Sequence, residues 1–161
     1  MSDSEQYLSS YNGHGGPVYS CRWAPFAERL FMSASADGTA RLWREDSPDP
    51  LLTFQSEDSQ GEVSDVAWSK TNSTVFGTVT SDGRLEIWDI SESVIKPSLT
   101  HIMDGYRLSC IVFAEASPVV LVGNDSGTVS VYRLVGVENQ KETLREQPGR
   151  LREALSGHEK A

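Results

Sequence analysis

The sequence predicts an all-β protein made of about three consecutive antiparallel sheets. Aromatic residues recur at a fixed interval, since Trp23, Trp68 and Phe113 lie 45 residues apart along the 161-residue chain. Short runs of Val, Ile, Thr and aromatic residues accompany each of these positions, and Asp-Gly or Ser-Gly pairs separate neighbouring runs. No apolar pattern with helical spacing occurs before residue 140.

Each repeat contains three strand-like runs in order. They cover residues 18–23, 30–35 and 39–43, then 63–68, 74–80 and 84–88, then 108–113, 119–123 and 128–132. An Asp-Gly or Ser-Gly turn precedes each third run, because glycine takes positive φ at no steric cost. A fourth run ends the first two repeats, at 51–54 and 98–102. Four antiparallel strands in about 45 residues are typical of a propeller blade.

This interpretation divides the chain into blades with a segment at either end. We expect a segment that forms the outer strand of a preceding blade, two regular blades, a degenerate third blade and a charged tail, at 1–12, 13–57, 58–102, 103–137 and 138–161. Within the tail, residues 150–155 either form a short helix that docks on the last blade or fray. Propellers usually close with about four to eight blades. We therefore expect a C-terminal portion of a longer protein, a short isoform or a partner-dependent piece.

The composition excludes several classes of function. Fourteen Lys and Arg against 23 Asp and Glu give a net charge of −9, which disfavours binding to nucleic acid or to anionic membranes. No apolar run approaches the roughly 18 residues of a membrane helix, and the first residues do not resemble a secretory signal. Cys21 and Cys110 fit no disulfide or metal pattern, so we expect buried free thiols in a reducing intracellular compartment.

Polar and aromatic residues of the first repeat resemble the WD-repeat family. The matching positions, in the family's order and spacing, are Gly13, His14, Val18, Trp23, Pro25, Ser35, Asp37, Gly38 and Trp43. The resemblance implies one hydrogen-bond network that joins His14, Ser35, Asp37 and Trp43. Arg44 stands where the family's name expects Asp.

The later repeats keep less of this pattern. The second has Thr80, Asp82 and Trp88, but Gly61-Glu62 stands in the expected place of Gly-His, so its network is incomplete. The third repeat is degenerate, and its resemblance to the family depends on its spacing and apolar pattern.

Ser35, His14 and Asp37 also suggest the alternative of a hydrolase triad. The sequence has no Gly-x-Ser-x-Gly nucleophile elbow, and the structural network accounts for Trp43 as well. None of the three histidines has metal-ligand spacing with a cysteine, and no phosphate-binding loop occurs. We therefore expect no catalytic residues, no metal site and no cofactor.

Longer runs resemble the final blades of dynein intermediate chains, above all the axonemal members of the inner-arm type. They lie at 7–26, 31–37, 61–69, 73–77 and 121–132. One departure is Asp37-Gly38, where that family is expected to have Asp-Trp. The resemblance implies a non-enzymatic scaffold of an axonemal dynein complex in the cytoskeleton of a cilium or flagellum. Its implied partners are the tail of a dynein heavy chain and other dynein intermediate and light chains. The alternative is a generic WD-repeat adaptor, such as a ubiquitin-ligase receptor or a trafficking scaffold.

A partner is expected to bind one rim of the propeller. His14 and Asp37 must lie at the same end of the blades for their network to form. Tyr and Arg are the residue types that most often dominate interfaces. The candidate partner-binding residues at that end are therefore Tyr19, Arg84, Tyr106 and Arg107.

Overall fold

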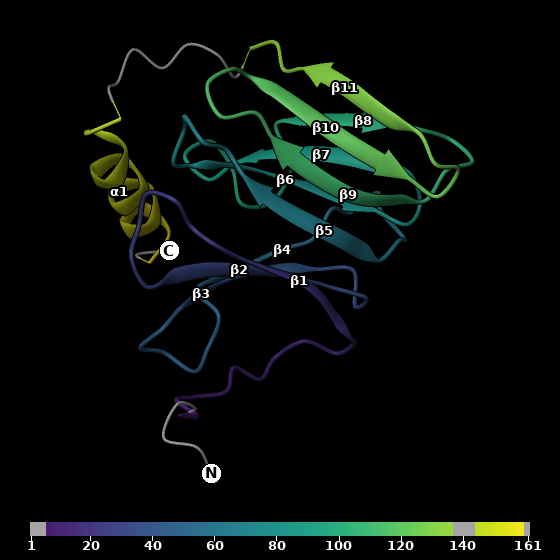
Figure 1. Ribbon diagram of the computed structural model, residues 1–161. Coiled ribbons are helices and arrows are strands. Elements are labelled where there is room, and N and C mark those ends of the chain that lie inside the picture. The colour runs from purple at the N-terminus through teal and green to yellow at the C-terminus, as the bar shows by residue number, and fades with distance from the viewer. Residues whose placement is uncertain (1–5, 137–143, 160–161) are drawn as a thin grey trace.

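The computed structural model describes residues 6–136 and 144–159, and it confirms the all-β prediction (Figure 1). The strands are β1 Val18–Trp23, β2 Leu30–Ser35, β3 Ala40–Arg44, β4 Leu52–Phe54, β5 Val63–Trp68, β6 Val75–Thr80, β7 Arg84–Asp89, β8 Leu99–Ile102, β9 Leu108–Phe113, β10 Val119–Asn124 and β11 Val129–Arg133. One helix, α1 Gln147–Glu159, follows them.

The strands form three antiparallel sheets, which we call blades 1, 2 and 3. Blade 1 has the order β1-β2-β3-β4 and blade 2 the order β5-β6-β7-β8, while blade 3 contains β9, β10 and β11. Gly38, Gly83 and Gly127 have φ of 84°, 86° and 86° in the turns before β3, β7 and β11, as the Asp-Gly and Ser-Gly pairs predicted. Blade 3 thus lacks a fourth strand among the described residues.

The apolar core lies between the blades. Met32, Leu42 and Phe54 of blade 1 join Trp68 and Phe76 of blade 2 in one buried cluster. The opposite side of blade 2 joins blade 3 in a second cluster. Because strand side chains alternate between the two faces, blade 2 contributes to both clusters. Blades 1 and 3 each use only one face in this way.

The prediction that the two cysteines are buried is wrong, because both lie on the outer faces of blades 1 and 3. Cys21 and Cys110 are free thiols, as expected, but both are exposed rather than buried. Cys21 lies on β1 in blade 1 and Cys110 on β9 in blade 3. Their side chains point to the faces of these two blades that no other described sheet covers.

The N-terminal segment is extended and departs from the prediction. Residues 6–17 contain no strand, so the outer strand expected within 1–12 is not formed in the described part of this segment. A strand requires ladder hydrogen bonds, and no described strand lies beside this segment to supply them. The segment instead packs on blade 1 at Tyr11, whose ring lies 5.0 and 5.8 Å from those of Phe31 and Trp43, and it runs beneath that blade in Figure 1.

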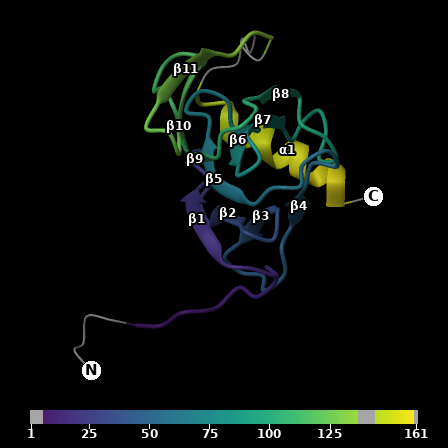
Figure 2. The same cartoon turned by 90° about the vertical axis from the view of Figure 1, so that its right-hand side faces the viewer.

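Helix α1 forms, but it docks elsewhere than predicted. It lies against blades 1 and 2 rather than on the last blade, since Leu151 is buried in the core cluster shared by those two blades (Figure 2). Ser73 holds its first residue, because the Ser73 N–H donates to Gln147 Oε1 at 2.8 Å. His158 Nε2 donates to the Ile90 carbonyl at 3.0 Å near its end. Among the residues described, no helix is long and apolar enough to cross a membrane.

Candidate functional site

A chain of hydrogen bonds ties the loop before β1 to the centre of blade 1. The Trp43 indole N–H donates to Ser33 Oγ at 2.8 Å, and Ser33 Oγ lies 2.6 Å from His14 Nε2. His14 Nδ1 lies 2.9 Å from Asp37 Oδ2. The carboxylate can only accept, so Nδ1 donates to it and Nε2 is left to accept the Ser33 hydroxyl proton. The predicted residues His14, Asp37 and Trp43 therefore come together.

Ser35, in contrast, lies outside this chain, and that part of the prediction is wrong. Its hydroxyl lies 3.1 Å from the Gly16 carbonyl oxygen and 2.9 Å from that of Pro17, and it accepts from the Asp37 N–H at 3.2 Å. Ser33 and Ser35 are two residues apart on β2, so both point to the same face. Only Ser33 is close enough to the Trp43 indole to link it with His14. The same geometry leaves Ser35 and His14 without the contact that a hydrolase triad requires.

Asp37 collects donors from three directions. Besides His14, Gly15 N–H donates to Oδ2 at 2.9 Å, and the Thr39 N–H and hydroxyl donate to Oδ1 at 2.9 and 2.7 Å. Burial opposes ionisation, but the hydrogen bonds from Thr39, Gly15 and His14 outweigh it and hold the Asp37 pKa well below its usual range. Asp37 is therefore a fixed anion that organises the turn.

Blade 2 repeats the arrangement with a shorter side chain. Ser59 occupies the place of His14, 45 residues later, and its hydroxyl lies 3.2 Å from Asp82 Oδ1. Asp82 also accepts from the Thr80 hydroxyl and, at 3.0 Å, from the Gln60 N–H. Burial opposes ionisation here too, yet these hydrogen bonds lower the Asp82 pKa. Thr78 stands 45 residues after Ser33, yet Trp88 Nε1 is buried with no hydrogen-bond partner among the described residues. The sequence pattern instead assigns the histidine position of blade 2 to Glu62, which does not contact Asp82 through its side chain in any described hydrogen bond.

The inner strands are joined by Asp65, which sequence analysis missed. Its Oδ1 accepts from the Ser20 hydroxyl of blade 1 at 2.6 Å, and its Oδ2 accepts from the Ile111 N–H of blade 3 at 3.0 Å. One buried carboxylate on β5 therefore links all three blades near their inner edges. The available signal was an acidic residue inside a mostly apolar inner strand.

Glu86 is a second buried carboxylate, between blades 1 and 2. It lies on β7 with 2% of its surface exposed, and its Oε2 has no hydrogen-bond partner among the described residues. Burial raises the Glu86 pKa, and a hydrogen bond with Ser56 opposes the rise only in part. The folded state therefore disfavours the ionised form of Glu86.

The rim that carries His14 and Asp37 brings three blades together at one polar cluster. Tyr19 Oη donates to Glu62 Oε2 at 3.3 Å, and Arg107 Nη2 lies 3.6 Å from the same oxygen. Tyr19 is half exposed and the Arg107 side chain is 64% exposed. We call Tyr19, Glu62 and Arg107 the rim cluster. Each comes from a different blade, at the beginning of its inner strand or immediately before it.

The other two candidate partner residues differ in exposure. The Arg84 side chain is only 17% exposed and lies 3.7 Å from Asp82 Oδ2, so it offers little surface to a partner. Tyr106 is exposed beside Arg107.

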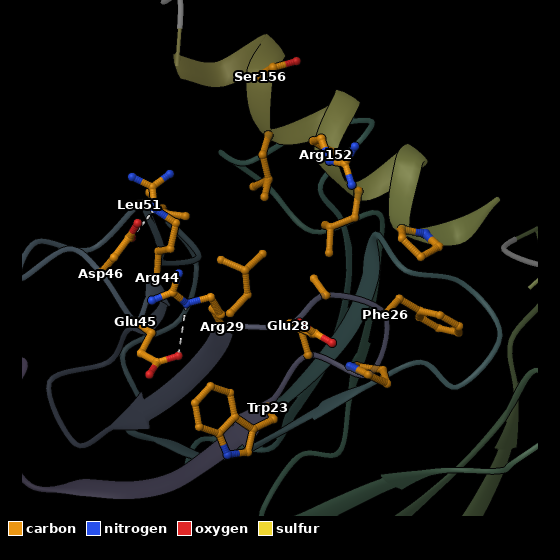
Figure 3. Close-up of a pocket in the computed structure, with 17 residues that line it drawn as sticks. Trp23, Phe26, Glu28, Arg29, Arg44, Glu45, Asp46, Leu51, Arg152 and Ser156 are labelled. Carbon is orange, nitrogen blue, oxygen red and sulfur yellow. Dashed lines mark hydrogen bonds and ion pairs between the residues drawn. The ribbon is translucent and has the colours of Figure 1, made fainter. Parts of the chain in front are cut away.

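The opposite end of blade 1 carries a groove that the sequence did not predict. It has a volume of about 1190 Å³ and lies between α1 and the turn that joins β1 to β2 (Figure 3). Leu51, Leu151 and Leu155 contribute to its apolar lining. Two ion pairs lie at its edge, Arg29 Nε with Glu45 Oε2 at 3.4 Å and Arg44 Nε with Asp46 Oδ1 at 2.5 Å. The groove depends on α1, whose docking position the sequence pattern did not give.

The candidate residues therefore form structural networks and an exposed polar cluster at the rim. Within 6–136 and 144–159, no group of three His, Cys, Asp or Glu side chains could hold a metal ion. The fixed carboxylates Asp37 and Asp82 direct their oxygens at backbone and side-chain donors of their own turns.

Comparison with known proteins agrees with this geometry. The family model described as "WD domain, G-beta repeat" matches residues 5–44 and 48–89. The chain is 38% identical over 143 residues to dynein axonemal intermediate chain 4 of Homo sapiens, covering 88% of this chain and 16% of that protein. It is 34% identical over 134 residues to the 78 kDa intermediate chain of the flagellar outer arm dynein of Chlamydomonas reinhardtii, covering 81% and 19%. It is 32% identical over 128 residues to cytoplasmic dynein 2 intermediate chain 2 of Mus musculus, covering 78% and 24%. The chain thus spans a quarter or less of these relatives.

Proposed function

Because this chain belongs to the WD-repeat family, we propose that it acts as a non-catalytic scaffold subunit of an axonemal dynein complex. Its similarity to dynein intermediate chains, which covers most of the chain, carries the proposal. In this role the chain binds the tail of a dynein heavy chain and supports motility of a cilium or flagellum. Other intermediate and light chains of the complex are its neighbours.

We assign the contact with the heavy chain to the rim cluster. Interfaces depend mostly on a few aromatic and Arg side chains surrounded by residues that exclude water. Tyr19 and Arg107 are such residues, and Glu62 holds both of them in position. Three blades contribute to this small area, so correct stacking of the blades positions the binding surface.

Arg107→Glu tests this assignment directly. The change places two carboxylates side by side and removes the cation at the centre of the cluster. We expect the dissociation constant for a purified axonemal heavy-chain tail to rise at least about tenfold, equivalent to about 1.4 kcal/mol. The measurement is biolayer interferometry with the full chain immobilised.

Arg29→Glu is the matched control. Arg29 is also an exposed Arg that pairs with a Glu, but it lies at the opposite end of blade 1. It should leave the affinity unchanged. Equal affinities of wild type, Arg107→Glu and Arg29→Glu would remove the rim cluster from the interface. Absence of binding by the wild-type chain would contradict the proposed function itself.

A further inference from the structure

Helix α1 is held to blade 2 by polar contacts. The Ser73 hydroxyl donates to the Gln147 carbonyl at 2.6 Å at the beginning of the helix, and Arg150 Nη2 donates to Ser91 Oγ at 3.2 Å about one turn later. Both partners lie in turns of blade 2. These hydrogen bonds fix the helix in place without filling the space between it and blade 1.

Apolar side chains of α1 face blade 1 across the groove shown in Figure 3. Leu151 is buried in the core cluster of blades 1 and 2. Leu155, one turn further along α1, is only partly buried, and so are Ala27 and Leu51 of blade 1. All four side chains line the groove. An open space of about 1190 Å³ therefore separates apolar walls that come from two different elements.

Backbone groups beside the groove are already hydrogen-bonded. The Ala24 N–H donates to the Leu30 carbonyl at 2.9 Å, and the Leu51 N–H donates to the Leu42 carbonyl at 2.8 Å. An extended peptide binds by pairing with free backbone groups of a strand edge, and these groups are not free. A helix satisfies its own backbone and requires only an apolar surface for its apolar stripe. The groove therefore suits a helix better than an extended peptide.

Charges of opposite sign lie on the two walls of the groove. Arg152 belongs to α1 and Glu28 to the turn between β1 and β2, and both side chains are exposed (Figure 3). Neither makes a hydrogen bond or an ion pair with any other residue that the structure describes. The two ion pairs at the edge of the groove, in contrast, neutralise their own charges. A ligand in the groove therefore meets a positive charge on the side of α1 and a negative charge on the side of the turn.

We propose that this groove binds an amphipathic helix of a partner protein. The helix lies alongside α1, with its apolar stripe on Leu51 and Leu155. Acidic residues at one edge of the stripe face Arg152, and basic residues at the other edge face Glu28. This inference does not depend on the proposed function, because the groove and the rim cluster lie at opposite ends of the blades.

Synthetic peptides as long as α1 test the charge pattern. All carry a fluorescein label and Leu at the i, i+3, i+4 and i+7 positions of one stripe, and they differ only in the residues beside it. The mixed peptide has Glu along one edge and Lys along the other, the basic peptide has Lys along both edges, and the acidic peptide has Glu along both. Fluorescence polarisation with the full chain gives each dissociation constant at about 0.15 M salt, where distant charges are screened.

Charge reversal on either wall should change which peptide is preferred. Arg152→Glu should shift the ratio of dissociation constants toward the basic peptide and away from the mixed one by about fivefold, because the acidic edge loses its partner. Glu28→Lys should shift the ratio toward the acidic peptide and away from the mixed one by a similar factor. Both positions are exposed, so far-ultraviolet circular dichroism should match that of the wild type.

Arg133→Glu is the matched control. It changes the net charge of the chain by as much as Arg152→Glu does, but Arg133 is an exposed residue of β11 in blade 3. It should leave the peptide preference of the wild type unchanged. A shift with Arg133→Glu as large as that with Arg152→Glu would show that net charge selects the peptide, and it would overturn the proposal. Failure of the wild-type chain to bind the mixed peptide would overturn it as well.

Discussion

Removal of the Ser33 hydroxyl is the sharpest test of the blade 1 network. Ser33→Ala leaves the Trp43 indole N–H and His14 Nε2 without their shared partner, and both side chains are almost fully buried. Each buried polar group left unsatisfied costs about 1–3 kcal/mol, so we expect a loss of about 3 kcal/mol in unfolding free energy. For a chain of this size, that corresponds to a fall of about 6–12 °C in Tm.

Urea denaturation followed by circular dichroism measures this change. Ser109→Ala is the control. Ser109 lies on blade 3, and its hydroxyl donates a single hydrogen bond, to the Gly123 carbonyl at 3.2 Å. It should lower the unfolding free energy by about 0.5–1 kcal/mol. Equal losses for Ser33→Ala and Ser109→Ala would refute the network described here.

Three further changes test the buried carboxylates and the helix. Glu86→Gln should raise the unfolding free energy at pH 7 by about 1 kcal/mol. Because the folded-state pKa of Glu86 is raised, the unfolding free energy of the wild type should be closest to that of this variant in acid, and it should fall relative to the variant as the pH rises through that pKa. Parallel pH profiles of the two proteins would contradict the raised pKa of Glu86. Asp37→Asn should lower the unfolding free energy at pH 7 by about 2–3 kcal/mol. Because the folded-state pKa of Asp37 is lowered, the loss should shrink as the pH falls below 3.8, and a loss independent of pH in urea titrations would contradict the role of its charge. Leu151→Ala should lower the unfolding free energy by about 2–4 kcal/mol and speed tryptic cleavage at Arg150; an unchanged cleavage rate would contradict the docking of α1.

The repeat gave most of the fold, because the spacing of aromatic residues and turns is a local property of the chain. Trp23, Trp68 and the Asp-Gly turns specify where each sheet begins and where its hairpins lie. The docking of α1 is different, since it depends on Ser73, Ile90 and other groups distant in sequence. No local pattern selects blades 1 and 2 over blade 3 as the surface for that helix.

The polar networks show where side-chain identity is not enough. Ser33 and Ser35 occupy the same face of one strand, so alternation cannot tell which of them reaches Trp43. Ser59 was missed because a serine gives no family signal at the histidine position, although the interval of 45 residues from His14 identifies it. The exposure of Cys21 and Cys110 follows from which blades are terminal, and that depends on the assembly of the sheets rather than on the strands themselves.

Affinity purification of the tagged full chain from ciliated-cell extract, read by mass spectrometry, tests the central claim most directly. The scaffold role in axonemal dynein predicts recovery of axonemal dynein heavy chains together with other intermediate chains, and a weaker yield of heavy chain with Arg107→Glu than with Arg29→Glu. Recovery of ubiquitin-ligase or trafficking components without dynein subunits would contradict it and favour a generic WD-repeat adaptor.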